Sequence, residues 1–314
     1  NAYYKDEKQE IRSEIIRYDK KNENYSTTGR SRMSDPPQIL EADKIDFDGN
    51  IGFAVGDVIW RDTAQNVSIS HCDSVTYLKE EDFLKAMGGR PLMTTLMDDD
   101  TLFLASDTLI SFKQNPEDSV RTLLAYPDVR LFKSDLQAVC DSLVYSEMDS
   151  LFKFYDDPVI WSDTSQFTGD TINVILKNGG IHQVLLKRKA FLINSTDEIY
   201  FNQIKGREII ANFKNDSIRT MNVNGNGETI YYIQDAQKAY ITANKTICSE
   251  MLITFQNNEL QDILFYKMPS GQTFPMKKIE RKPLELEDFK WRIKERPKSK
   301  EDLRDSPVLV KVEN

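Results

Sequence analysis

The chain has 314 residues, of which 39% are hydrophobic and 29% are charged, and its formal net charge is −9. This charge argues against nucleic acid as a partner, because phosphate backbones need surfaces of clustered Lys and Arg. No apolar stretch approaches the ~20 residues that a membrane-spanning helix needs. The opening residues "NAYYKDEKQE" lack the pattern of a signal peptide, so they do not indicate a compartment.

Cysteine and histidine are the residues that would suggest metal or redox chemistry. The chain has three cysteines, Cys72, Cys140 and Cys248, and two histidines, His71 and His182, with no CxxC or Cys/His spacing. A zinc site therefore has no support, and no motif surrounds either histidine that would make it catalytic. We expect no metal, no cofactor and no enzymatic activity.

A short phrase recurs along the chain. Each copy begins with a small residue, continues with an anchor position that is most often Asp, and then alternates apolar and polar residues. Alternation with a period of two indicates one face of a β-strand, and recurrence at intervals of about 30–40 residues indicates stacked supersecondary units. The copies are "SEIIRY" at 13–18, "ADKIDF" at 42–47, "CDSVTY" at 72–77, "SDTLIS" at 106–111, "CDSLVY" at 140–145, "GDTINVIL" at 169–176, "GREIIANF" at 206–213 and "CSEMLITF" at 248–255.

The small first residue accounts for all three cysteines without redox chemistry, since a free cysteine behaves as a small hydrophobe. Cys72 and Cys140 are two units apart, which places their Cα atoms at about 9.6 Å, beyond the reach of a disulfide. The Asp anchor is expected to hydrogen-bond a turn backbone rather than a ligand.

A second kind of strand lies between these copies. "DVIWRDT" at 57–63 resembles "PVIWSDT" at 158–164, and "DVRLFKSD" at 128–135 is a looser copy. Turns such as "KNGG" and "QNNE" contain Asn, which tolerates the positive φ of tight hairpins. One short helix is predicted at 79–89, "KEEDFLKAMGG", closed by Gly88. "DDD" at 98–100 is expected to be a solvated loop, and "GNG" at 225–227 a turn.

These patterns predict an all-β fold of about eight two-strand rungs, with two antiparallel sheets facing each other across a long apolar seam. The seam is a packed core if the sheets close and a groove if they splay. We expect one repetitive domain at 1–280, followed by a charged, Pro-containing C-terminal tail at 281–314 that reads as extended.

The phrases "ADKIDF", "VGDVIW", "CDSVTY", "SDTLIS", "CDSLVY" and "GDTINV" resemble the OstA-like or LptA family of periplasmic lipopolysaccharide-transport proteins, over roughly residues 13–268. The resemblance implies an elongated, V-shaped β-jellyroll slab in the periplasm. It also implies that the slab carries the acyl chains of lipid A, and that it joins itself or other transport proteins end to end. This chain has more rungs than a minimal member, and its later anchors are Arg207 and Ser249 instead of Asp.

The residues expected to line a lipid-binding seam are the alternating apolar residues of both kinds of strand. They are Ile16, Tyr18, Ile45, Phe47, Val58, Trp60, Val75, Tyr77, Leu109, Val129, Leu131, Leu143, Tyr145, Val159, Trp161, Ile172, Val174, Ile209, Phe213, Met251 and Ile253.

Two alternatives remain open at this point. The repeated carboxylates, Asp107 and Asp141 among them, could form the row that a carbohydrate-active enzyme needs on one face of a β-helix. The seam could also be a dry core throughout, which would make the chain a purely structural repeat protein or an adhesin.

Overall fold

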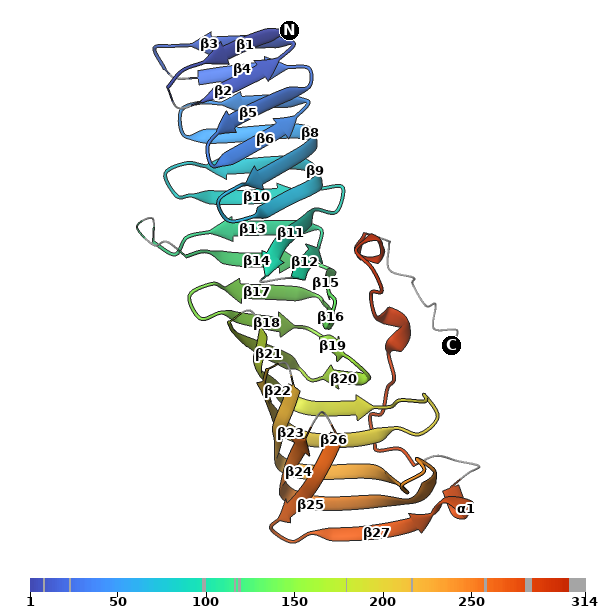
Figure 1. Cartoon of the computed structure of the whole chain (residues 1–314). Coiled ribbons are helices and arrows are strands. Elements are labelled where there is room, and N and C mark those ends of the chain that lie inside the picture. Colours follow the sequence, from blue (N-terminus) through green and yellow to red (C-terminus); the bar gives the residue numbers. More distant parts are fainter. Residues whose placement is uncertain are drawn as a thin grey trace. The chain divides into compact units, whose positions relative to one another are not determined.

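The computed structural model describes residues 1–7, 9–22, 24–97, 100–115, 117, 120–178, 180–215, 217–256, 259–279 and 284–304. Antiparallel strands dominate these residues (Figure 1), which confirms the predicted all-β class. Helical structure in the described part comprises one short helix, α1 (Met276–Ile279), and two 3₁₀ turns, η1 (Ile293–Glu295) and η2 (Glu301–Leu303).

The chain forms two compact units. Unit 1 contains Asn1–Ser134 and Pro297–Asn314, and unit 2 contains Asp135–Arg296. The predicted domain at 1–280 and tail at 281–314 stay predictions, but the described part of that tail contributes residues 284–296 to unit 2 and 297–304 to unit 1.

In unit 1 the strands pair in two series, which we call the first and second ladders. The first ladder runs through β3 (Ile15–Asp19), β4 (Asn24–Thr28), β7 (Lys44–Phe47), the start of β8 (Ile51–Asp62), the end of β9 (Val67–Leu78), β10 (Phe83–Met87), β13 (Thr108–Phe112) and β14 (Thr122–Tyr126). The second runs through β1 (Ala2–Lys5), β2 (Glu10–Ser13), β5 (Ser31–Asp35), β6 (Gln38–Ala42), the end of β8, the start of β9, β11 (Leu92–Met97), β12 (Asp100–Ala105) and β15 (Val129–Lys133).

Unit 2 has the same two kinds of ladder. Its first ladder runs through β17 (Ser142–Ser146), β18 (Leu151–Tyr155), β21 (Thr171–Lys177), the start of β22 (Gly180–Asn194), the end of β23 (Asn202–Lys214), the start of β24 (Ser217–Gln234), the end of β25 (Tyr240–Gln256) and β26 (Glu259–Tyr266). Its second runs through β16 (Leu136–Cys140), β19 (Val159–Ser162), β20 (Ser165–Thr168), the end of β22, the start of β23, the end of β24, the start of β25 and β27 (Ser270–Pro275).

The chain passes from one ladder to the other at a corner that recurs in both units. In unit 1 the backbone N–H of Asp43 donates to the carbonyl of Gly56 at 3.0 Å, and that of Asp73 to Gly88 at 3.2 Å. In unit 2 the N–H of Asp170 donates to Arg188 at 3.0 Å. Each accepting residue has positive φ. The anchor residue therefore stabilises the corner through a hydrogen bond from its own backbone N–H. This is a structural role for the repeated phrase.

Most of the small residues that precede the anchors are enclosed at this corner. Ala42 and Ser106 are 0% exposed and Cys72 is 1% exposed, so the corner leaves no room for a larger side chain. Cys140 and Cys248 are also buried, and all three cysteines are free thiols. This agrees with the packing role that the sequence indicates for them.

The helix predicted at 79–89 is wrong. Residues Phe83–Met87 form β10, which pairs with β9 on one side and β13 on the other. Leu84 and Ala86 are buried, while Lys85 between them is not, so the segment has the two-residue period of a strand. Pairing with two neighbouring strands overrides the local helix propensity of these residues.

Candidate functional site

The inner faces of the two ladders of unit 1 contact each other. The rings of Tyr4 on β1 and Tyr18 on β3 are 4.8 Å apart. The Tyr25 hydroxyl on β4 donates to Met33 Sδ on β5 at 2.6 Å. Because each pair joins a strand of the first ladder to a strand of the second, these side chains define an interior between the ladders.

The centre of this interior is tightly packed. Successive strands of the first ladder place a large residue opposite a small one, so that neighbouring side chains interdigitate. Each of these residues is at most 2% exposed. In register order they are Ile45, Ala54, Val75, Ala86, Leu109 and Ala125.

One margin of the same interior is lined by aromatic rings, of which Tyr25 is buried and the others are partly exposed. Tyr18, Tyr25 and Phe47 follow one another in register on β3, β4 and β7, and the rings of Tyr25 and Phe47 stack at 5.2 Å. Tyr18 and Phe47 are partly exposed, as is Tyr77 on β9. Burial raises the pKa of Tyr77. This margin offers apolar surface to a ligand.

The side chains of the second ladder of unit 1 also change from partly exposed to fully buried along its length. Met33, Leu40 and Trp60 are in register on β5, β6 and β8 and are partly exposed. Further along, Leu104 and Leu131 are in register on β12 and β15 and are 0% exposed. The interior of unit 1 is therefore closed toward Leu131 and more accessible toward β5.

The structure brings together the predicted seam residues of unit 1. Those in its packed centre and beside the corner are Ile45, Val58, Val75, Leu109, Val129 and Leu131, all buried; those that are partly exposed are Ile16, Tyr18, Phe47, Trp60 and Tyr77.

In unit 2 the predicted residues of the first ladder also share one face. Leu143, Ile172, Ile209 and Met251 belong to one register row, and Tyr145, Val174 and Ile253 to the next row. Phe213 follows a register shift and is partly exposed. The same rows contain residues that the recurring phrase did not indicate, because they lie on the partner strands: Phe152, Phe154, Val184, Leu186, Met221 and Val223.

Val159 and Trp161 were expected on the face of the strand that lines the seam. They lie on the opposite face of the second ladder of unit 2. Trp161 is in register with Gln137 and Gln166, and both of these glutamines bond to residues of the segment 290–296. The side chains on the opposite face of the same ladder include Ile160 and Phe167, which are also buried.

A single residue accounts for this reversal. In unit 1, Val58 directly follows Asp57, which ends the positive-φ corner. In unit 2, Pro158 stands between the positive-φ residue Asp157 and Val159. Because side chains alternate with a period of two, one inserted residue moves every following side chain to the other face.

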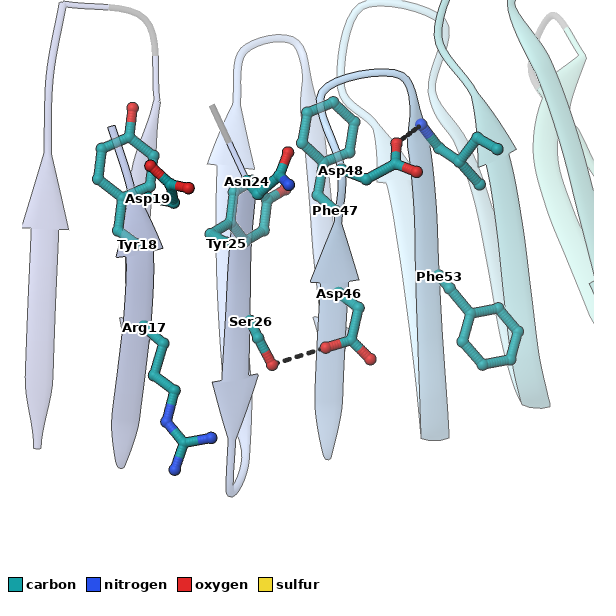
Figure 2. A pocket seen from close by; sticks show the side chains of 11 residues that line it. Arg17, Tyr18, Asp19, Asn24, Tyr25, Ser26, Asp46, Phe47, Asp48 and Phe53 are labelled. Atoms are coloured by element: carbon teal, nitrogen blue, oxygen red, sulfur yellow. Dashed lines mark hydrogen bonds between the residues drawn. The ribbon is translucent and has the colours of Figure 1, made fainter. Parts of the chain in front are cut away.

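A hollow with a volume of about 580 Å³ lies on β3, β4, β7 and β8, and Figure 2 shows the side chains that line it. Arg17, Ser26, Asp46 and Phe53 are in register here, and they alternate with Tyr18, Tyr25 and Phe47, so their side chains lie on the outer face of the ladder. Ser26 Oγ donates to Asp46 Oδ1 at 2.6 Å, and Lys44 Nζ pairs with Asp46 Oδ2 at 2.6 Å. The residues that line this hollow also include Tyr18, Tyr25 and Phe47 of the aromatic margin.

The carboxylates considered for catalysis are engaged individually. The Asp107 carboxylate pairs with Arg90 at 3.3 Å in unit 1, and the Asp141 carboxylate accepts a bond from Ser142 Oγ in unit 2. His71 and His182 are exposed. Asp98 and Asp99 of the "DDD" stretch lie outside the described residues, while Asp100 accepts bonds from the backbone and hydroxyl of Ser134.

Over the described ranges, no three His, Cys, Asp or Glu side chains gather in a way that could hold a metal ion. Within the same ranges, no helix has the length and apolarity needed to cross a membrane. In comparisons with known proteins, no family model matches the chain and no curated protein matches it.

Proposed function

We propose that this chain is a non-catalytic envelope protein that binds an acylated lipid, with lipopolysaccharide as the first candidate, in the apolar interior of its ladders. The observation that carries the proposal is the margin of unit 1, where Tyr18, Phe47 and Tyr77 are aligned and partly exposed beside a fully packed centre. A fully closed core would not leave large aromatic side chains on β3, β7 and β9 of one ladder open to one side.

We infer that the two ladders of each unit are the two sheets of a β-jellyroll, splayed in a V from the recurring corner. The corner supports this, because positive φ at Gly56 and Gly88 turns each strand sharply between the ladders. The contact between Tyr25 and Met33 supports it too, since it joins the two ladders across the interior. The resemblance of the recurring phrases to the OstA-like family points to the same architecture.

The free energy gained by burying an acyl chain in such an interior is sufficient for lipid binding. Burying one CH₂ group contributes about 0.8 kcal/mol, so a chain of about twelve carbons gains roughly 10 kcal/mol before the cost of ordering is subtracted. That cost removes a good part of the gain, yet the remainder is enough for a carrier that takes up and releases its lipid.

Unpaired strand edges support the partners that we propose, and the resemblance to the OstA-like family supports the location. In the described part, β1 and β3 each pair on one side only, as do β26 and β27 in unit 2. An unpaired strand edge is a template for adding a strand from another chain. We propose that these edges join the chain to further transport proteins or to another copy of itself, in the periplasm.

The test is photo-crosslinking from matched aromatic positions on β7 and β8. A photoreactive phenylalanine analogue at Phe47 faces the interior, and the same analogue at Phe53, which is 44% exposed, faces outward. In cells or membranes that contain lipopolysaccharide, we expect a lipid adduct at Phe47 and none at Phe53. Equal labelling at the two positions, or labelling at neither, would count against lipid binding.

A structural role is the second candidate, and a specific observation favours it. Leu104, Leu109 and Leu131 are 0% exposed, which is how a dry core is packed. In that case lipid extracted from the purified full chain would be at trace level, and the exposed margin would simply be the edge of a core.

A further inference from the structure

The segment 284–296 covers one face of the second ladder of unit 2, which we call the glutamine face. On successive strands this face alternates glutamine with a large apolar residue. In register order its members are Gln137, Trp161, Gln166, Ile193, Gln203 and Ile230, on β16, β19, β20, β22, β23 and β24.

Two of these glutamines bond to the backbone of the segment in the same way. Gln203 donates from Nε2 to the carbonyl of Leu284 at 2.9 Å and accepts at Oε1 from the N–H of Leu286 at 2.8 Å. Gln166 donates to the carbonyl of Lys290 at 2.7 Å and accepts from the N–H of Arg292 at 2.7 Å. Each side-chain amide thus pairs with residues i and i+2, as a neighbouring β-strand would.

The third glutamine continues the series. Gln137 Oε1 accepts from Arg296 Nε at 2.7 Å, and Arg296 also donates to the carbonyl of Asp163 at 2.8 Å. Because the three glutamines lie on every second strand of the ladder, neighbouring ones are about 9.6 Å apart. The glutamine face therefore bonds the segment at regular intervals along its length.

Burial shows that these amides depend on the segment. Gln203 is 0% exposed, Gln166 is 1% exposed and Gln137 is 3% exposed. A buried amide without a partner is costly, so a face that needed only an apolar cover would not place three of them in its centre. The glutamine face has the composition of a surface that binds a peptide backbone.

Apolar side chains of the segment fill the spaces between the amides. Leu286 packs with Phe191, Ile193 and Ile230, and Leu284, Phe289 and Trp291 pack against the same cluster. The rings of Phe289 and Trp291 lie 5.3 Å and 5.4 Å from that of Phe201. The side chains that distinguish this segment from others are therefore apolar residues at 284, 286, 289 and 291.

We propose that the glutamine face is a peptide-recognition surface whose resident ligand is the segment 284–296, and that it accepts the same segment from a second copy of this chain when its own has left. Every contact described above joins the segment to the face, so the contacts are the same whichever copy supplies the segment. Exchange of an identical element between copies is a low-cost route to association. This proposal is independent of lipid binding.

The test uses the full chain and a labelled synthetic peptide with the sequence of residues 284–296. The release variant combines Leu286→Asp with Trp291→Ala. These changes weaken the binding of the resident segment to the glutamine face and leave the residues of the face unchanged. We expect hydrogen exchange of 284–296 to accelerate at least tenfold, and the peptide to bind this variant at least tenfold more tightly than the unchanged chain. Adding Gln203→Met to the release variant should abolish the binding, and a peptide carrying the same two changes should not bind.

Three results would overturn the proposal. One is a release variant whose segment exchanges rapidly but which binds the peptide no better than the unchanged chain. Another is a segment that stays protected despite both changes, because its apolar residues would then not be what the face recognises. The third is undiminished binding after Gln203→Met. If the release variant does not fold, Leu286→Ala alone serves in its place, with the same comparison of exchange and peptide affinity.

Discussion

The backbone N–H of Asp73 donates to the carbonyl of Gly88 at 3.2 Å, and a Cβ placed on Gly88 would lie 2.6 Å from Asp73 Oδ2. The anchor of one rung therefore lies directly against the corner of the next. Gly88 has a φ of +74°, a conformation in which side chains are strained. Both its conformation and the space available depend on the absence of a side chain.

Replacing Gly88 with alanine should lower the free energy of unfolding by about 1–3 kcal/mol, because the new methyl group meets Asp73 and the left-handed backbone is strained. The measurement is a urea unfolding curve followed by circular dichroism. Gly52→Ala is the control: Gly52 lies in β8, and the nearest atom to its added Cβ would be 3.6 Å away, an ordinary contact. Equal midpoints for the two variants would contradict the role of the corner.

Leu109→Ala should destabilise the protein by about 2–5 kcal/mol, because Leu109 is 0% exposed and its removal leaves a cavity between Ala86 and Ala125. Leu96→Ala, at a position 53% exposed on β11, should change the stability by less than about 0.5 kcal/mol. Thermal or urea unfolding of both variants checks the difference. A small effect at Leu109 would mean that the interior of unit 1 is loosely packed at its centre.

Phe47→Asp should reduce the retention of acylated lipid by about 10–100-fold, since burial of one Phe side chain contributes roughly 1.5–3 kcal/mol and every 1.4 kcal/mol is tenfold in affinity. Phe53→Asp places the same charge on the outer face and should leave retention unchanged. Lipid that co-purifies with each full-length variant can be extracted and quantified by mass spectrometry. Equal loss in both variants would indicate a general effect on folding.

The ion pairs of Asp82 predict that the stability of unit 1 depends on pH. Its carboxylate bonds Arg121 at 2.8 Å and Lys113 at 3.0 Å. Burial alone would raise the pKa of Asp82, but the hydrogen bonds and charges of Arg121 and Lys113 outweigh it and lower the pKa below the usual value. A carboxyl with a lowered folded-state pKa stabilises the protein above its unfolded pKa of about 3.9, and this stabilisation is lost as the pH falls through the folded pKa.

Asp82→Asn should therefore reduce the free energy of unfolding by about 1–3 kcal/mol at pH 7. The difference from the unchanged chain should shrink as the pH falls below about 4. Urea unfolding of both chains between pH 2.5 and 7 measures this difference. If the difference in the free energy of unfolding between the two chains does not change with pH, the ion pair is not the cause of that difference.

The three cysteines should resist modification in the native protein. Burial raises the pKa of the Cys72 thiol to about 12, so almost none of it is the reactive thiolate at pH 8. We expect no addition of N-ethylmaleimide to the folded chain within minutes, and three additions in urea, measured by intact mass. Rapid labelling of the folded chain would show that the corner opens more readily than its burial indicates.

The recurring phrases predicted the strands and which of their side chains share a face. Val75 and Leu109 show why: alternation over a few residues reveals which side chains share a face, whatever the strand pairs with. The same phrases could not indicate Phe154 or Leu186, because these lie on partner strands whose sequences do not repeat, and only the pairing register places them beside Leu143 and Ile172.

Local sequence by itself determined that this chain is built from antiparallel strands with small residues at recurring corners, because strand periodicity and steric limits act over a few neighbouring residues. Tertiary structure decided the rest. Pro158 reverses the face on which Trp161 lies, pairing on both sides makes a strand of Phe83–Met87, and buried glutamines hold a charged C-terminal segment that looked extended. Each of these outcomes depends on contacts between residues distant in the sequence, whose free energies outweigh local preference.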